Sequence, residues 1–170
     1  LPNIIFDNGD NHKRDRNIWQ SWRNAYAPDH VSTTGITQPP MLAEAIVRIG
    51  IKLKNVERRS WYQDMYPALI AYHQWLYKER DPHNEGLVLL IHPWESGLDN
   101  SPPWIDQLHM HSKPTWIRII EKLKLDKTII LFRRDTQHVP PGQRVSNIDA
   151  LLYFNIIQRL KRKNWDIDKI

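Results

Sequence analysis

One turn-rich stretch decides how the chain folds and what it does: His92-Pro93-Trp94-Glu95-Ser96-Gly97-Leu98-Asp99-Asn100-Ser101-Pro102-Pro103-Trp104. It combines two carboxylates, two tryptophans and several short polar side chains. A solvated linker does not need two tryptophans, and a buried element rarely holds so many polar groups together. Apolar ring faces beside an acid and hydrogen-bonding groups are what a sugar site requires. The structural alternative is that Asp99 is a turn former that caps a helix starting near Pro102.

The composition is that of an ordinary globular protein. The chain has 170 residues, of which 41% are hydrophobic and 25% charged, close to average usage. The absence of cysteine excludes disulfides and thiolate metal sites. No apolar run approaches the ~20 residues of a membrane span. The excess of 24 basic over 19 acidic residues is modest, and its densest cluster, 159–163, falls at a predicted helix end, where cations are favourable. We therefore expect a cytoplasmic protein without nucleic-acid or membrane partners.

Hydrophobic periodicity predicts an all-α chain of five or six helices. Apolar residues repeat at three and four over 42–53, after Pro39-Pro40, and again over 60–79, where Pro67 should kink or split the helix. The segments 102–110 and 114–123 favour short helices. Ser146-Asn147 is typical of the start of a last helix, with its apolar face at Ile148, Leu151, Leu152, Ile156 and Leu160. The short apolar run 87–91 should lead into the acid stretch from the interior.

Several motifs, in order, resemble one group of enzymes. The run Glu95-Ser96-Gly97-x-Asp99-Asn100-Ser101 with Trp104 is similar to the acid-loop signature of inverting glycoside hydrolases that include glycoside hydrolase family 63 and the trehalases. Preceded by His92-Pro93-Trp94, it resembles the family 63-like mannosylglycerate and glucosylglycerate hydrolases. The segments 35–40 (Gly-Ile-Thr-Gln-Pro-Pro), 66–82 and, more loosely, 133–147 resemble further parts of the same group. The resemblance covers about residues 35–155.

The resemblance implies a fold and a reaction. The related enzymes are (α/α)6 toroids of helical hairpins, so the chain would be about half of one. Residues 1–170 are then a single partial catalytic domain, incomplete at both ends. The aspartate of the signature, here Asp99, would be the general acid, and its pKa would have to be raised. The family's general base is a glutamate expected beyond residue 170, so we expect no glycosidase activity from the chain alone.

The remaining candidate residues each have two interpretations. Glu95 competes with Asp99 as the acid, but hydrogen bonding to loop N–H groups is the preferred role. Gln38 offers an acceptor and two donors to sugar hydroxyls, or caps the next helix. Trp94 forms a stacking wall or packs in the core. Gly97 admits a sugar close to the backbone or only permits a turn with positive φ.

Other features favour no different chemistry. Asn100 and Ser101 orient Asp99 or cap the next helix, and we favour capping. His109 and His111, with His92 or His73, fit no standard metal spacing, so we expect no metal and no cofactor. The family often continues Pro-Arg-Trp-Asp where this chain has Pro103-Trp104-Ile105-Asp106, which leaves the fine specificity open.

Two classes of function therefore remain open. The first is a fragment of an inverting glycosidase that acts on a small α-linked glucoside or mannoside, such as mannosylglycerate or glucosylglycerate, with trehalase or oligosaccharide α-glucosidase activity as variants. The second is a non-catalytic carbohydrate-binding or structural remnant of such a domain. The partner that we expect is a small carbohydrate substrate, and the oligomeric state stays open.

Overall fold

The computed structural model describes residues 1–98, 102–111, 113–133, 140 and 145–169. It is predominantly helical, with helices α1 (Lys13–Trp19), α2 (Leu42–Lys52), α3 (Asn55–Arg80), α4 (Pro102–Met110), α5 (Thr115–Lys122) and α6 (Asn147–Arg162). The 3₁₀ helices are Asp10–His12, Ser21–Arg23, Pro93–Ser96, Leu125–Phe132 and Ile167–Lys169. The all-α prediction is confirmed, since the described strands are only β1 (Ile5–Phe6) and β2 (Ser32–Thr33).

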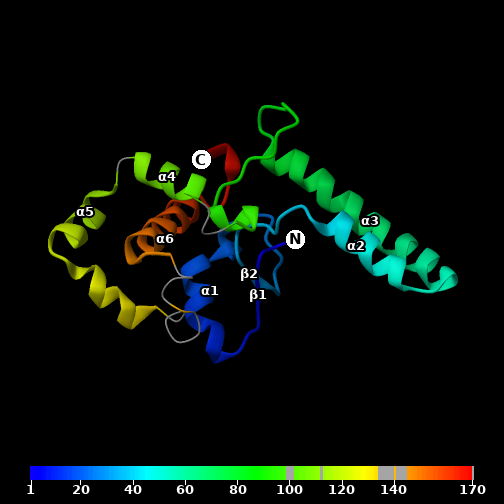
Figure 1. Cartoon of the computed structure of the whole chain (residues 1–170), viewed down its shortest axis with the longest axis horizontal. Coiled ribbons are helices and arrows are strands. Elements are labelled where there is room, and N and C mark those ends of the chain that lie inside the picture. Colours follow the sequence, from blue (N-terminus) through cyan, green and yellow to red (C-terminus); the bar gives the residue numbers. More distant parts are fainter. Residues whose placement is uncertain (99–101, 112, 134–139, 141–144, 170) are drawn as a thin grey trace.

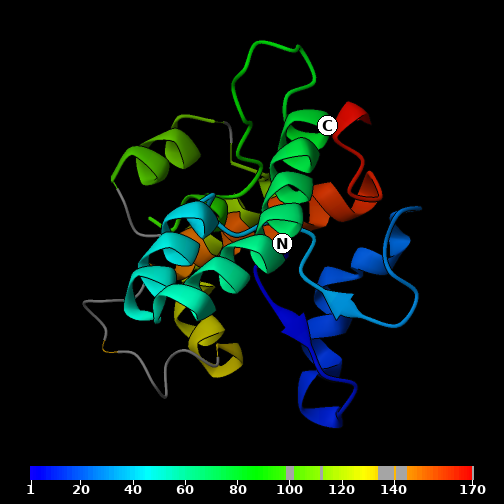
Figure 2. The same ribbon diagram turned by 90° about the vertical axis from the view of Figure 1, so that its right-hand side faces the viewer.

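The elements form two groups around a shared centre (Figure 1). The α2–α3 hairpin extends to one side, while α4, α5 and α6 lie on the other, beside α1. The antiparallel strands β1 and β2 pair Ile5 with Thr33 and Phe6 with Ser32. They lie beside α1, below the α2–α3 hairpin in the view of Figure 2. No helix in the described ranges combines the length and apolar character needed to cross a membrane.

The core lies where the N-terminal segment meets α6. Its buried members come from all along the sequence and are Phe6, Trp19, Ile36, Ile157, Leu160 and Trp165. The rings of Trp19 and Trp165 stack with centroids 5.7 Å apart, which joins the end of α1 to the turn that follows α6. Because this core includes Ile36, the segment that carries Gln38 leaves directly from it.

The helices predicted after residue 40 are present, whereas α1 was not predicted. The predicted α4 and α6 agree with the structure, and the Ser146 side chain accepts a hydrogen bond from the Asp149 N–H at the start of α6. Helix α3 runs without a break through Pro67, so the predicted split does not occur. Because Pro67 and Gln63 are exposed, water can satisfy the Gln63 carbonyl that loses its helical donor.

The prediction for 87–91 is wrong in part. Leu87 is 69% exposed and Leu89 45% exposed, so this run does not come from the interior. Only Ile91, its last residue, packs against the core. The segment instead follows a turn fixed by Asp81, whose carboxylate accepts hydrogen bonds from the N–H groups of Glu85 and Gly86. The run therefore brings the chain back along the surface to the stretch that begins at His92.

Candidate active site

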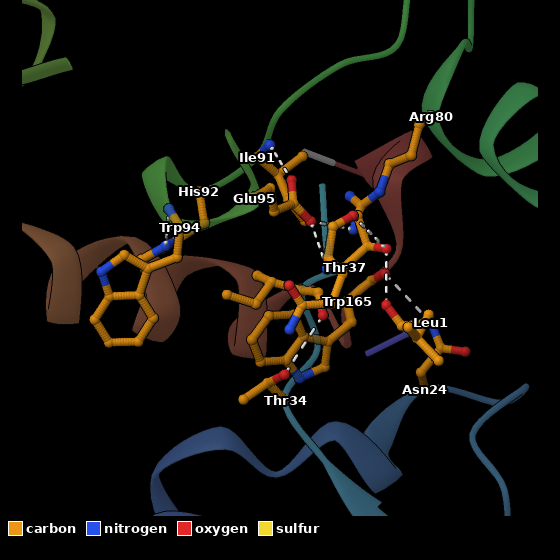
Figure 3. Close-up of polar contacts among 12 residues, drawn as sticks. Leu1, Asn24, Thr34, Thr37, Arg80, Ile91, His92, Trp94, Glu95 and Trp165 are labelled. Atoms are coloured by element: carbon orange, nitrogen blue, oxygen red, sulfur yellow. Dashed lines mark hydrogen bonds and ion pairs between the residues drawn. The ribbon is translucent and has the colours of Figure 1, made fainter. Parts of the chain in front are cut away.

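Glu95 is at the centre of the polar contacts in this region (Figure 3). Its side chain is completely buried, with 0% exposed. Oε1 accepts hydrogen bonds from the Thr37 N–H at 2.9 Å and from Arg80 Nη2 at 2.8 Å, and Oε2 accepts one from the Ile91 N–H at 2.8 Å. Hydrogen bonding to backbone N–H groups is the role that the sequence favoured for Glu95. The carboxylate thereby joins its own turn to the Thr37 segment and to the end of α3.

The electrostatics of Glu95 combine two opposed influences. Burial raises the pKa of its carboxyl, while Arg80 and the surrounding backbone donors lower it. Burial also lowers the pKa of the Arg80 guanidinium, which lies 5.4 Å from the centre of the Trp75 ring. A buried pair of this kind is costly to break from either side, because the remaining charge is left without a partner. Glu95 and Arg80 therefore fix the end of α3 against the turn that follows His92.

His92 shapes the start of this turn. Its Nδ1 accepts a hydrogen bond from the Trp94 N–H at 3.2 Å, at the N-terminus of the 3₁₀ helix Pro93–Ser96. Burial lowers the pKa of His92 to about 4, so the ring is neutral near pH 7 and can act as this acceptor. Its ring lies edge-on to those of Trp94 and Tyr153, at 4.9 and 5.4 Å between centroids.

Trp94 is half-buried and packs against the core cluster. Its ring centroid lies 6.1 Å from that of Trp19 and 6.2 Å from that of Tyr153. The structural interpretation of Trp94 as a packing residue therefore holds. Because Trp94 is not fully buried, the sugar contact stays a prediction.

Gln38 and Gly97 bring the two main sequence motifs together. Gln38 Nε2 donates to the backbone oxygen of Asn3 at 2.8 Å. It does not cap α2, whose N-cap residue is Met41 and has no side-chain cap bond. Gly97 has a φ of +70°, the left-handed turn that favours glycine. A Cβ at this position would lie 3.0 Å from Pro39 Cγ, so the residue that follows Gln38 packs against the turn.

Asp99 and Asn100 lie outside the described residues, as does Ser101. Their assignments as acid and as supporting or capping residues therefore remain predictions. The structure describes the chain up to Leu98 and again from Pro102, where α4 begins.

Two contributors to this region had no role assigned from the sequence. Arg80 and Tyr72 stand in the sequence only as parts of the 66–82 segment, yet both are buried. Tyr72 contacts the backbone of Gln38, and Arg80 contacts Glu95. The available signal was the position of an arginine just before Asp81-Pro82, at a helix end. Such an arginine is usually solvated, so nothing in the sequence pairs it with a glutamate fifteen positions later.

The histidines make separate contacts. His109 Nε2 lies 2.8 Å from Asp149 Oδ1, His111 Nδ1 bonds to the Gln107 oxygen and His73 Nδ1 to that of Leu69. Within the described ranges no three His, Cys, Asp or Glu side chains form a group that could hold a metal ion.

A cavity of about 700 Å³ opens beside the Glu95 contacts. It is lined by Thr37, Tyr72, Trp75 and Arg80, among others, and not by Gln38, Trp94 or Gly97. The three predicted sugar-binding residues therefore share a region of the fold without lining this hollow.

Known proteins resemble the chain over almost its whole length. Residues 1–166 match the family model described as the mannosylglycerate hydrolase MGH1-like glycoside hydrolase domain. A mannosylglycerate hydrolase of Thermus thermophilus is 35% identical over 98% of the chain and 37% of its own length. A glucosylglycerate hydrolase of Mycolicibacterium hassiacum is 30% identical over 100% of the chain and 37% of its own length.

Solved structures give the same result. The crystal structure of a GH63 mannosylglycerate hydrolase from Thermus thermophilus, in complex with Tris and D-glycerate, superposes with a TM-score of 0.68 and 28% identity. The match covers 96% of the chain and 35% of that structure, so the chain spans about a third of the length of these relatives. Its helices thus form part of an all-α toroid of this type. The chain belongs to the mannosylglycerate hydrolase MGH1-like glycoside hydrolase family.

Proposed function

We propose that the chain is part of the catalytic domain of an inverting glycoside hydrolase that cleaves a small α-linked mannoside or glucoside, such as mannosylglycerate or glucosylglycerate. The family and the names of several relatives support this substrate class. The domain is completed by further sequence, which supplies the general base. The protein acts in the cytoplasm on a small carbohydrate.

One observation carries the proposal. Glu95, completely buried, binds the N–H of Thr37 and so ties the residue before Gln38 to the turn that leads to Asp99. The Gly97 turn lies close to Pro39, the residue after Gln38. Two motifs that suggested sugar chemistry separately are thus neighbours in the fold, as a single site would require.

Asp99 acts as the general acid. It protonates the glycosidic oxygen as the bond to the sugar carbon breaks, while a carboxylate from outside the chain removes a proton from the attacking water. Inverting enzymes hold these two carboxyl groups roughly 6.5–9.5 Å apart, so that the water fits between the base and the sugar. Glu95 is unsuited to the acid's role because its oxygens accept hydrogen bonds from the Thr37 and Ile91 N–H groups and from Arg80.

Gln38 binds a sugar hydroxyl. With one N–H used on Asn3, its amide keeps a second N–H and an oxygen that accepts no bond from the described residues. Trp94, which is half-buried, stacks its ring against the sugar, and Gly97 allows close approach of the backbone. Asn100 supports the acid or caps the following helix.

Product stereochemistry tests this proposal. The complete enzyme is incubated with mannosylglycerate or glucosylglycerate, and the first sugar released is followed by proton NMR. We expect free glycerate and initial accumulation of the β-anomer from an α-linked substrate. No release of glycerate from either compound, or initial release of the α-anomer, would overturn the proposal.

A further inference from the structure

The Tyr72 hydroxyl holds the backbone at Gln38. Tyr72 lies on α3 and is only 6% exposed. Its Oη donates a hydrogen bond to the backbone oxygen of Gln38 at 2.6 Å and lies 3.1 Å from Thr37 Oγ1. The side chain of Gln38 reaches in another direction, to the backbone of Asn3. Tyr72 thus fixes where Gln38 lies, and Gln38 as a whole is half-buried rather than fully buried.

Helix α3 also holds the Thr37–Gln38 segment at a second point, through Glu95. Arg80, eight residues after Tyr72 on this helix, binds Glu95, and Glu95 accepts from the N–H of Thr37. The two bonds fall on the two sides of one dipeptide: the N–H of Thr37 and the C=O of Gln38. A dipeptide held at both ends has little freedom to shift relative to the turn at Glu95.

We propose that Tyr72 is a positioning residue for substrate binding, which sets the place of Gln38 without touching the sugar. This inference rests on the proposed function, in which Gln38 binds a sugar hydroxyl. Removal of the hydroxyl leaves a part-buried carbonyl with a weaker partner, the Thr37 hydroxyl at 3.3 Å, so the segment shifts to find another donor. A displacement of this kind weakens a directional hydrogen bond to the sugar.

The test uses Tyr72→Phe in the complete enzyme, with Tyr77→Phe as the matched control. Tyr77 lies on the same helix, but its side chain is 59% exposed. For mannosylglycerate we expect Tyr72→Phe to raise KM about three- to tenfold, the effect of one net hydrogen bond, with kcat changed less than about twofold. Tyr77→Phe should change neither value. Partial unfolding lowers apparent kcat but not KM, so the KM remains informative even if the variant is less stable.

A double-mutant cycle with Gln38→Ala separates this inference from the proposed function. If Tyr72 acts through Gln38, Tyr72→Phe changes KM by less than about twofold in the Gln38→Ala background. A full further increase in that background, or an unchanged KM in Tyr72→Phe alone, would overturn the positioning role and leave the sugar contact standing. An unchanged KM in Gln38→Ala alone would overturn the sugar contact itself, and the positioning role with it.

Discussion

The substitution Glu95→Gln tests the polar connection between the two motifs. It preserves the size of a completely buried side chain but replaces one acceptor oxygen with an amide that only donates. The oxygen that remains cannot serve both the Ile91 N–H and the pair formed by the Thr37 N–H and Arg80. One backbone N–H is then left without an acceptor, and the Arg80 charge loses its counter-ion.

The expected loss is large for a single change. Removing one partner of a buried ion pair costs roughly 3–5 kcal/mol, and a buried N–H without an acceptor costs roughly 1–3 kcal/mol. Because these costs overlap, we expect the free energy of unfolding to fall by about 4 kcal/mol. Urea denaturation of the complete enzyme, monitored by tryptophan fluorescence, measures this free energy of unfolding.

Glu44→Gln is the matched control. Glu44 pairs with Arg48 one turn later on α2, and both side chains are largely exposed. Such pairs contribute about 0.3–0.5 kcal/mol. In a cycle with Arg80→Met, the double variant should lose less than the sum of the single losses, since no charge remains unpaired. A loss below about 1 kcal/mol in Glu95→Gln, or strict additivity with Arg80→Met, would refute this explanation.

Three further predictions concern His92, two glycines and the isolated chain. Burial lowers the pKa of His92 to about 4, against about 6.5 when unfolded, so the fold favours the neutral ring. The free energy of unfolding should therefore fall by about 3 kcal/mol as the pH drops from about 6.5 to about 4. Urea titrations across this range should show a flatter dependence on pH in His92→Gln. Both Gly97→Ala and Gly86→Ala place alanine at positive φ, at a cost of roughly 1–2 kcal/mol, but only the new methyl group at position 97 also meets Pro39. Thermal melts should therefore show the larger loss of stability in Gly97→Ala, and equal losses in the two variants would contradict this packing. Residues 1–170 alone should not hydrolyse mannosylglycerate in a glycerate-release assay, and activity that Asp99→Asn abolishes would contradict the need for a base from outside.

Local signals made helices α2 to α6 predictable, whereas α1 was not predicted. The Pro102-Pro103 pair and the serine at 146 mark the starts of α4 and α6, and the apolar repeat marks α2. These features depend on neighbours within a few positions, which a sequence displays directly. Strands β1 and β2 escaped prediction because two residues each are too few to show an alternating pattern.

The site was only partly predictable, because its contacts are long-range. The sequence singled out Glu95 as a residue that binds backbone N–H groups, but not which ones. The Thr37 N–H, which it binds, lies 58 positions away. The roles of Arg80 and Tyr72 could not be predicted for the same reason, because their partners are set by how α3 packs and not by residues nearby in the sequence. The prediction that residues 87–90 come from the interior failed because an apolar run predicts burial, whereas these residues are exposed.

The most direct test of the central claim is Asp99→Asn in the complete enzyme, assayed on two substrates. The glycerate of mannosylglycerate needs a proton on the glycosidic oxygen in order to leave. Fluoride, in contrast, leaves α-mannosyl fluoride with little help from an acid. The account predicts that kcat for mannosylglycerate falls about 10²- to 10⁴-fold, the usual contribution of a general acid, while kcat for the fluoride falls far less. Equal losses on both substrates, or an unchanged rate on mannosylglycerate, would contradict Asp99 as the acid.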